Sequence, residues 1–194
     1  VEQLPGSQPG QVSGGDLELV EREAQRIVAE RRAFRADQFR LASNPRAHSL
    51  YTAQEILRQS DGAIDAFCDF AGTGGSFAGC AAAFKQANPA IGCYVVEPEG
   101  AAVLAGEPAW QPNHRIQGGG YSMAELPLVE RGLIDGFLRV SDEQAMQMAR
   151  RLAKEEGIFA GFSAGANVAA ALMLLEAEYR GKTVAVLLSD SGLK

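Results

Sequence analysis

The apolar residues near the start of the chain recur at helical spacing. Between residues 16 and 32 they return every three or four positions, which predicts an amphipathic helix. A second helix is predicted from Asn44 to about Leu57. Asn44 is a favoured N-cap residue, and Pro45 suits the first helical position because it has no backbone N–H to satisfy.

Strand-like and helix-like segments alternate through the rest of the chain. Short apolar runs predict strands at residues 63–70, 91–98, 137–140, 158–161 and 182–188. Helices are predicted between them, at 76–87, from a capping box at 141–144 to Gly157, and at 164–179. This alternation predicts an α/β fold with a doubly wound, mostly parallel sheet and helices on both faces.

Both ends of the sequence break this pattern. Residues 1–4 have the composition of the tail of a strand, and residues 193–194 follow the last predicted strand without a closing helix. We therefore expect the fold to be truncated at both ends. Residues 1–37 are expected to be the last part of a smaller N-terminal α/β domain, and residues 38–194 a larger α/β domain.

Composition and charge restrict the class of protein. Hydrophobic residues make up 46% of the chain and charged residues 22%, which is typical of a soluble globular protein. A net charge of -6 argues against a general nucleic-acid binder. No apolar run reaches the roughly 18 residues of a membrane span, and the N-terminus lacks the features of a signal peptide, so a cytoplasmic location without membrane contact is expected.

The three cysteines do not have the spacing of a metal site. Cys68, Cys80 and Cys93 form no C-x-x-C pair, and the chain contains only two histidines. We therefore expect no bound metal. Since Cys68 and Cys93 fall in apolar, strand-like runs, buried free thiols are the prediction.

A glycine-rich turn lies between a predicted strand and a predicted helix. It comprises Gly72, Thr73, Gly74, Gly75 and Ser76. Glycines let a ligand approach the main chain closely, and the amides at a helix N-terminus offer partial positive charge to an anion. The turn therefore predicts a phosphate-binding loop, to which the two hydroxyls can donate further hydrogen bonds.

Other interpretations of the motifs remain open. The turn could simply connect strand to helix, and it fits a dinucleotide fingerprint only weakly, because Phe77 stands where the third glycine belongs. A Walker loop requires a lysine that is missing here. Residues 161–165 satisfy the G-x-S-x-G pattern of hydrolases, but no histidine follows Ser163 to act as its base.

Several separated segments together resemble the cysteine synthase family of pyridoxal-phosphate enzymes. In chain order they are QF at 38–39, NPRAH at 44–48, GTGGS at 72–76, VEP at 96–98, HRIQG at 114–118, VSDE at 140–143, EGI at 156–158, GFSAGA at 161–166 and DSG at 190–192. The match covers essentially the whole chain, and it corresponds to the carboxyl-terminal two-thirds of a family member. The resemblance implies the fold of the tryptophan synthase β chain.

The resemblance also implies roles for individual residues. Pyridoxal 5'-phosphate would be the cofactor, with its phosphate held by residues 72–76 and its pyridine nitrogen faced by Ser163. Gln38 and Gly118 would line the substrate side of the cleft, and residues 38–194 would form the cofactor-binding domain. Ser163 could also be the N-cap of its helix. After Gly118 the sequence GGYS at 119–122 departs from the family's I-G-x-G, so the substrate-facing loop differs.

By the same resemblance, the reaction would be β-elimination and β-replacement on an O-activated serine, as in the synthesis of cysteine from O-acetylserine and sulfide. Serine or threonine dehydration, cystathionine formation and 2,3-diaminopropionate synthesis are alternatives that use the same site. The family's Schiff-base lysine belongs to a segment upstream of this sequence, so the chain alone is expected to be inactive and to contribute no catalytic residue. A homodimer acting on a small amino acid is expected. A truncated, non-catalytic relative that serves as a binding module is the alternative from another class.

Overall fold

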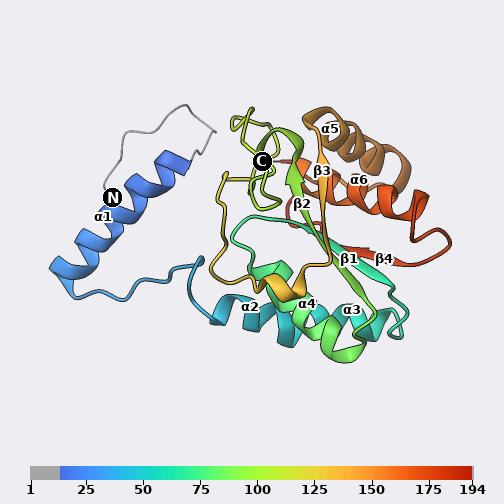
Figure 1. The fold of residues 1–194 in the computed structure, drawn as a ribbon, viewed down its shortest axis with the longest axis horizontal. Coiled ribbons are helices and arrows are strands. Elements are labelled where there is room, and N and C mark those ends of the chain that lie inside the picture. Colours follow the sequence, from blue (N-terminus) through green and yellow to red (C-terminus); the bar gives the residue numbers. More distant parts are fainter. Residues whose placement is uncertain (1–13, 194) are drawn as a thin grey trace.

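A computed structural model describes residues 14–193. Its centre is a four-stranded sheet of β1 (Ala66–Phe70), β2 (Gly92–Pro98), β3 (Gly136–Val140) and β4 (Val184–Val186). The strands run in the order β3-β2-β1-β4, and every neighbouring pair is parallel. Figure 1 shows helices on both faces of this sheet, so the predicted α/β fold is confirmed.

The helices divide into two groups around the sheet. One face is covered by α4 (Gly75–Ala87) together with a continuous helical run of α2 (Ser43–Ala47), a π-helical turn (His48–Thr52) and α3 (Ala53–Gln59). The other face carries α5 (Asp142–Arg151), its π-helical extension (Leu152–Glu156) and α6 (Phe162–Glu176). Short 3₁₀ turns at Glu99–Ala101 and Arg131–Leu133 interrupt the long segment between β2 and β3.

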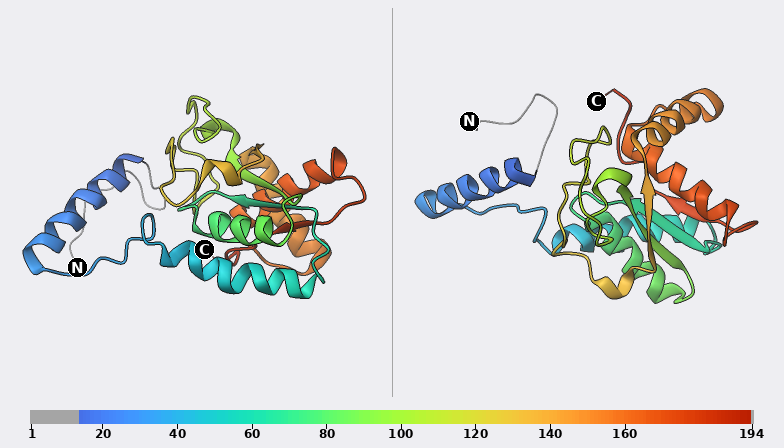
Figure 2. Two further views of the ribbon diagram at one scale, coloured as in Figure 1. Left: turned by 60° about the horizontal axis from the view of Figure 1, so that its bottom comes forward. Right: turned by 45° about the horizontal axis from the view of Figure 1, so that its top comes forward.

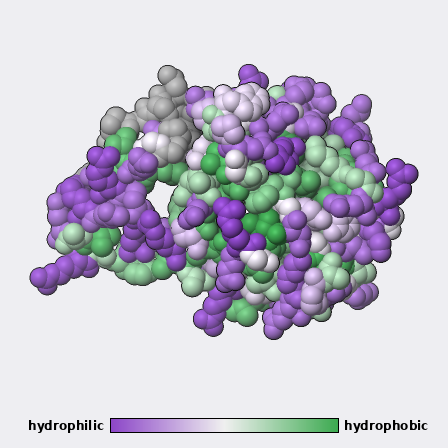
Figure 3. All heavy atoms as spheres, in the orientation of Figure 1, coloured by the Kyte–Doolittle hydropathy of each residue, from purple (hydrophilic) through white to green (hydrophobic). Residues whose placement is uncertain are grey.

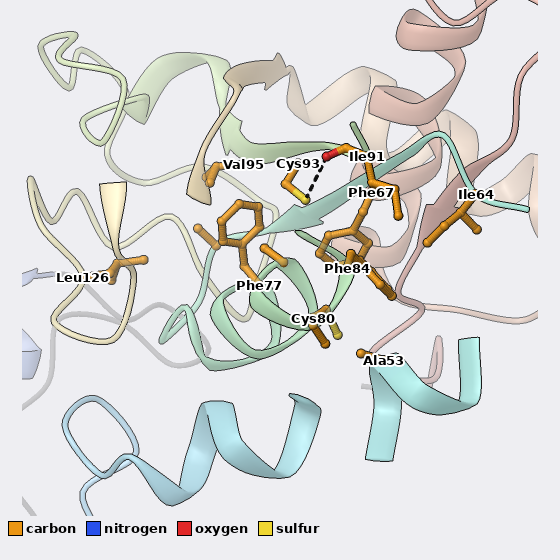
Figure 4. Packing of buried hydrophobic residues seen from close by; sticks show 13 residues of the cluster. Ala53, Ile64, Phe67, Phe77, Cys80, Phe84, Ile91, Cys93, Val95 and Leu126 are labelled. Carbon is orange, nitrogen blue, oxygen red and sulfur yellow. Dashed lines mark hydrogen bonds between the residues drawn. The ribbon is translucent and has the colours of Figure 1, made fainter. Parts of the chain in front are cut away.

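Large aromatic side chains fill the space between β1 and α4 (Figure 4). Phe67 projects from the strand, and its ring meets the ring of Phe84 edge to face at 5.2 Å and that of Phe77 at 6.1 Å. All three rings are almost completely buried. Because α4 places Phe77 and Phe84 two turns apart on one face, this layer fixes the helix against the sheet.

The opposite layer is built mainly from alanine. Alanines of α5 and α6 pack against Ala66, Cys68 and Phe70 of β1 and against Val96 and Val140 of the neighbouring strands. Small side chains allow the helices to approach each other and the sheet closely. The capping box predicted for α5 is confirmed, because the Ser141 hydroxyl accepts a hydrogen bond from the Gln144 amide and the Gln144 side chain accepts one from the Ser141 amide.

Some predicted boundaries are wrong. Residues 158–161 do not form a strand, because their only ladder contact is an isolated antiparallel bridge between Ala160 and Ser191. The last strand is shorter than predicted, since only residues 184–186 pair with β1. Gly157 does adopt the predicted left-handed conformation, with φ +70°, where the α5 segment ends. The strand tail predicted at residues 1–4 lies outside the described residues.

Helix α1 (Gly14–Arg31) stands apart from the sheet and its helices (Figures 1 and 2). In Figure 3 its surface is mostly hydrophilic, whereas hydrophobic atoms gather over the middle of the body. Ion pairs from Arg35 and Arg40 to Glu21 join the helix to the segment that follows it. No helix within residues 14–193 has the length and apolar content needed to cross a membrane.

The prediction of buried free thiols is confirmed. Cys68, Cys80 and Cys93 are all buried and unpaired. Burial raises the pKa of the Cys68 thiol well above its usual range, and it raises the pKa of Cys80 and of Cys93 to about 12. These thiols therefore stay protonated and behave as small apolar core residues.

Candidate functional site

The glycine-rich turn joins the carboxyl end of β1 to the amino end of α4. Gly74 is the N-cap residue of α4, its φ of +80° lies in the left-handed region, and no side chain caps the helix. No hydrogen bond within residues 14–193 uses the amides of Gly74, Ser76 or Phe77. The first turn of α4 therefore presents free N–H groups at the positive end of a 13-residue helix, which is the arrangement that binds phosphate groups.

Asn44 supports this turn from the neighbouring helical run. Its side-chain amide donates to the Gln38 carbonyl at 2.7 Å and to the Thr73 hydroxyl at 3.2 Å. A Cβ at Gly75 would collide with the Asn44 side chain, so only glycine fits there. The prediction that Asn44 caps its helix is wrong, because α2 begins at Ser43 and Asn44 lies inside it. Its side chain holds the turn in place.

Gly118 lies directly against the turn. A Cβ at Gly72 would lie 2.6 Å from the Gly118 carbonyl oxygen, and the Gly120 amide donates to the Ala71 carbonyl at 2.9 Å. Gly118 itself has a φ of +96°, a conformation that favours glycine. The loop that was predicted to face the substrate is therefore held against the glycine-rich turn by main-chain contacts.

A cavity of about 460 Å³ lies between this loop and the start of α6. Its walls include Gly118, Tyr121 and Phe162. The Tyr121 ring also meets the Phe39 ring at 6.3 Å, which brings the segment containing Gln38 to the same region. The volume falls in the range of small-ligand sites. The cavity thus borders Gly118 and the residue next to Ser163.

Ser163 is the second residue of α6. The N-cap of that helix is Gly161, so the alternative that Ser163 is the N-cap is wrong. Ser163 is 7% exposed, and its hydroxyl donates to Asp190 Oδ1 at 3.5 Å, the upper limit for such a contact. The two cavities that border the turn at Gly74 and at Gly72 are not lined by Ser163. Hydrogen bonds through the sheet connect the turn to the helix of Ser163 instead.

Neither histidine forms a hydrogen bond with Ser163, as the hydrolase interpretation would require. His48 Nδ1 lies 3.1 Å from the Thr52 hydroxyl, and His114 Nε2 lies 3.0 Å from the Gly120 carbonyl. Both histidines are therefore engaged away from Ser163, whose hydroxyl contacts an aspartate. A serine nucleophile requires a histidine or an equivalent base within hydrogen-bond reach.

A buried carboxyl lies beneath the turn. Asp69, on β1, is 2% exposed, and it accepts hydrogen bonds from the Ser76 hydroxyl at 2.5 Å and from the Asn167 side-chain amide at 3.2 Å. Burial raises the pKa of Asp69 to about 6, although both hydrogen bonds act in the opposite direction. Asp69 is thus a group that changes charge near neutral pH directly below the candidate phosphate site.

Asn167 connects this carboxyl to α6. Its side-chain amide also donates to the Leu187 carbonyl at 2.8 Å, just after β4 ends, while its Oδ1 has no partner within residues 14–193. Asn167 is fully buried and lies one helical turn after Ser163. The chain Ser76–Asp69–Asn167 therefore links the turn on one face of the sheet to the helix that carries Ser163 on the other.

Sequence reasoning missed Asn44, Asp69, Asn167 and Asp190 as site residues. A signal existed for Asp69, because a carboxylate inside an otherwise apolar strand is seldom fully buried without specific partners. Asn44 and Asp190 stand in two of the segments that resemble the family, at 44–48 and 190–192, and this was a signal for them. Asn167 is distinguished only by its contacts.

The described lysines Lys85, Lys154 and Lys182 form no hydrogen bond or ion pair with the turn. Lys85 pairs with Asp135 at 2.5 Å and Lys182 with Asp65 at 3.3 Å, while Lys154 lines a second cavity together with Phe162 and Asp190. Residues 14–193 also contain no group of three or more histidine, cysteine or acidic side chains that could hold a metal ion.

Comparison with known proteins agrees with the geometry of the turn. The cysteine synthase of Staphylococcus aureus (strain Mu50) is 38% identical over 173 residues, which are 88% of this chain and 54% of that protein. Among solved structures, a cysteine synthase from Entamoeba histolytica superposes with a TM-score of 0.80 at 33% identity, covering 88% of this chain and 50% of that one. An O-ureido-L-serine synthase gives 0.81 at 35% identity, covering 89% and 54%.

The chain spans about half the length of these relatives. A family model described as "Pyridoxal-phosphate dependent enzyme" matches residues 4–190, nearly the whole sequence. Together with the unpartnered amides of the turn, this match establishes that the chain belongs to the pyridoxal-phosphate dependent enzyme family.

Proposed function

We propose that this chain binds pyridoxal 5'-phosphate and forms the cofactor-binding part of a β-replacement enzyme of the cysteine synthase type. The observation that carries the proposal is the first turn of α4, whose amides at Gly74, Ser76 and Phe77 have no partner within residues 14–193. A Cβ at Gly74 would collide with Val129 and one at Gly75 with Asn44, so both positions require glycine. A phosphate monoester fits these free amides and the close backbone approach.

The residues of the chain would act mainly by binding and orientation. Residues 72–76 would hold the phosphate, and the Ser163 hydroxyl would face the pyridine nitrogen. Its contact with Asp190 is long enough for the hydroxyl to turn and donate its hydrogen to that nitrogen. Gln38 and Gly118 would border the amino-acid substrate. The cofactor supplies the electron-withdrawing ring that makes loss of a β-substituent feasible.

The proposed reaction is the formation of cysteine from O-acetylserine and sulfide. The similarity to cysteine synthases supports this choice. A second candidate is the formation of another β-substituted alanine, which the similarity to an O-ureido-L-serine synthase favours. The loop after Gly118 lines the cavity with Tyr121 and would set the choice of nucleophile.

We also infer that turnover needs a lysine outside residues 1–194. Lys85 and Lys182 are held by aspartates, and Lys154 lines neither the cavities at the turn nor the cavity at Gly118. Residues 1–37 would belong to a smaller domain, and residues 38–194 to the cofactor-binding domain. A homodimer in the cytoplasm is proposed for the whole protein. Native mass measurement of the full-length protein tests the dimer, and cell fractionation tests the location.

Binding of the cofactor phosphate tests the central proposal. The Gly74→Ala variant would place a methyl group against Val129 in a left-handed backbone position, and we expect its affinity for 4-deoxypyridoxine 5-phosphate to fall by about tenfold or more. Gly62→Ala is the matched control, because Gly62 has a φ of +71° but open space around it. Equal affinities of the two variants for the ligand would refute the phosphate site.

A turnover assay compares residues 1–194 with the full-length protein. With pyridoxal phosphate, O-acetylserine and sulfide, we expect cysteine to be formed by the full-length protein and not by residues 1–194. Cysteine formation by residues 1–194 would contradict the need for an external lysine. Cofactor binding without turnover by the full-length protein would instead favour the non-catalytic binding module.

A further inference from the structure

Within residues 14–193, the buried carboxyl beneath the turn has no cationic partner. Asp69 faces Ser76 and Cys80 from α4, Asn167 from α6 and its strand neighbour Cys68. Within residues 14–193, no lysine, arginine or histidine side chain forms a hydrogen bond or ion pair with Asp69 or with the turn. An anion bound at the turn would therefore meet an uncompensated carboxylate across a single hydroxyl group.

That hydroxyl has only one hydrogen to donate. Ser76 donates it to Asp69 Oδ2 at 2.5 Å, so the Ser76 oxygen can offer only lone pairs to a ligand while Asp69 is ionised. A phosphoryl oxygen also needs a donor. The ionised carboxylate and the phosphoryl group thus compete for the same hydrogen, and they repel each other in a partly buried setting.

We propose that a phosphoryl group at residues 72–76 is bound together with one proton, which Asp69 takes up at Oδ2. This inference rests on the proposed phosphate site. The proton comes from solvent, and no other bond is made or broken. The protonated Oδ2 then donates to Ser76 Oγ, and the Ser76 hydrogen is released to donate to the phosphoryl oxygen.

The surroundings of Asp69 suit this exchange. Its other oxygen, Oδ1, keeps the hydrogen bond from Asn167 in either charge state, so the carboxyl stays in place. Burial already raises the pKa of Asp69 to about 6, and an added anion raises it further, so the proton is taken up at neutral pH. Ser76 is half-buried, and it lies in the first turn of α4, where its own amide is free while its hydroxyl reaches Asp69.

Sulfate is the probe that tests the inference, because it stays a dianion across pH 5.5–8.0 and does not titrate as phosphate does. Binding of sulfate to residues 1–194 is measured by isothermal titration calorimetry across that range. We expect sulfate affinity to fall by about tenfold per pH unit once Asp69 is ionised in the free protein. Titrations at pH 7 in buffers of different ionisation enthalpy should show uptake of about one proton per sulfate.

The Asp69→Asn variant is the decisive comparison. Its amide nitrogen takes the place of the protonated Oδ2 and donates to Ser76, so sulfate affinity should be independent of pH and proton uptake should vanish. Glu97→Gln, a change at another buried carboxyl, should keep the wild-type pH dependence. Both histidines are present in each variant, so their titration cancels.

The outcomes separate the two proposals. If sulfate and 4-deoxypyridoxine 5-phosphate both fail to bind at any pH, the phosphate site itself is wrong and the proton linkage falls with it. If sulfate binds with an affinity independent of pH and without proton uptake, the linkage is wrong while the phosphate site stands. The proton count on the wild-type protein decides this even if Asp69→Asn does not fold.

Discussion

Two buried carboxyl groups lie on neighbouring strands, and they differ in the donors that bind them. Asp69 on β1 is 2% exposed and Glu97 on β2 is 3% exposed, and burial raises the pKa of both. Glu97 accepts hydrogen bonds from the main-chain amides of Leu104 and Ala105, both at 2.9 Å. Asp69 accepts hydrogen bonds from two side chains, Ser76 and Asn167, besides a weaker main-chain contribution from Phe70.

The difference lies in what the donors can do. A main-chain amide is always a donor, so Glu97 can only hold the loop that follows β2 in place. A hydroxyl can donate or accept, so the hydrogen bond between Ser76 and Asp69 can reverse when the carboxyl gains a proton. Burial alone therefore does not indicate which carboxyl can be linked to ligand binding. The informative feature is a hydrogen-bond partner that can change from donor to acceptor.

Among the changes that test this comparison, removing the Asn167 side chain should lower the free energy of unfolding the most. Asn167→Ala deletes the hydrogen bonds to Asp69 and Leu187 and leaves a small cavity, which we expect to lower the free energy of unfolding by about 4 kcal/mol at pH 7.5. The loss should be smaller at pH 4.5, where Asp69 is neutral. Urea unfolding measures both values, with the exposed Asn113→Ala as a control that changes stability by less than about 0.5 kcal/mol. Equal losses at both pH values would show that the Asp69 charge is not involved.

The pH dependence of stability should be the next largest effect. Between about pH 4 and 6 an unfolded chain has Asp69 ionised, whereas the folded chain keeps it protonated, since its pKa rises from 3.8 to about 6. The folded state then binds more protons, so stability falls as pH rises through this window. Relative to Asp69→Asn, the wild-type protein should lose about 3 kcal/mol in free energy of unfolding, at about 1.4 kcal/mol per unit of pKa. Parallel stability curves for the two proteins would rule this out.

The Glu97→Ala change should have a smaller and purely structural effect. It leaves the amides of Leu104 and Ala105 without their acceptor, and we expect a loss of about 2 kcal/mol in free energy of unfolding. Glu107→Ala, which removes an exposed ion pair with Arg139, should cost less than about 0.5 kcal/mol. Sulfate affinity should stay within about twofold of wild type in both variants. A large loss of affinity in Glu97→Ala would place Glu97 at the ligand site as well.

The Ser76→Ala change should have the smallest effect in energy. It removes a single charge-assisted hydrogen bond to the ligand, so sulfate affinity at pH 6 should fall by about tenfold, or about 1.4 kcal/mol. Ser189→Ala, at an exposed serine that forms no hydrogen bond with the turn, is the control. Calorimetric titration measures both. Unchanged affinity in Ser76→Ala would mean that the free amides bind the anion without the hydroxyl.

Local features were predictable because their causes lie within a few residues. The capping box at Ser141 and the left-handed Gly157 were both predicted, as was the strand–turn–helix around residues 72–76. The predicted strand at 158–161 failed because an apolar run cannot show whether a partner strand lies beside it, and here only Ala160 bridges to Ser191. The N-cap prediction for Asn44 failed in the same way, because local sequence does not show a contact with a distant residue. Its contact with Thr73 spans 29 residues.

The sequence by itself determined the alternation of strands and helices, the glycine-rich turn and the family, because apolar spacing, glycine positions and ordered motifs are local features of the chain. Only the tertiary structure decided which carboxyl lies under that turn. Asp69 and Asn167 are 98 residues apart, and they meet because α6 packs over β1 where β4 has ended. Such a contact depends on how helices and strands pack across the whole sheet, which no local pattern of residues specifies.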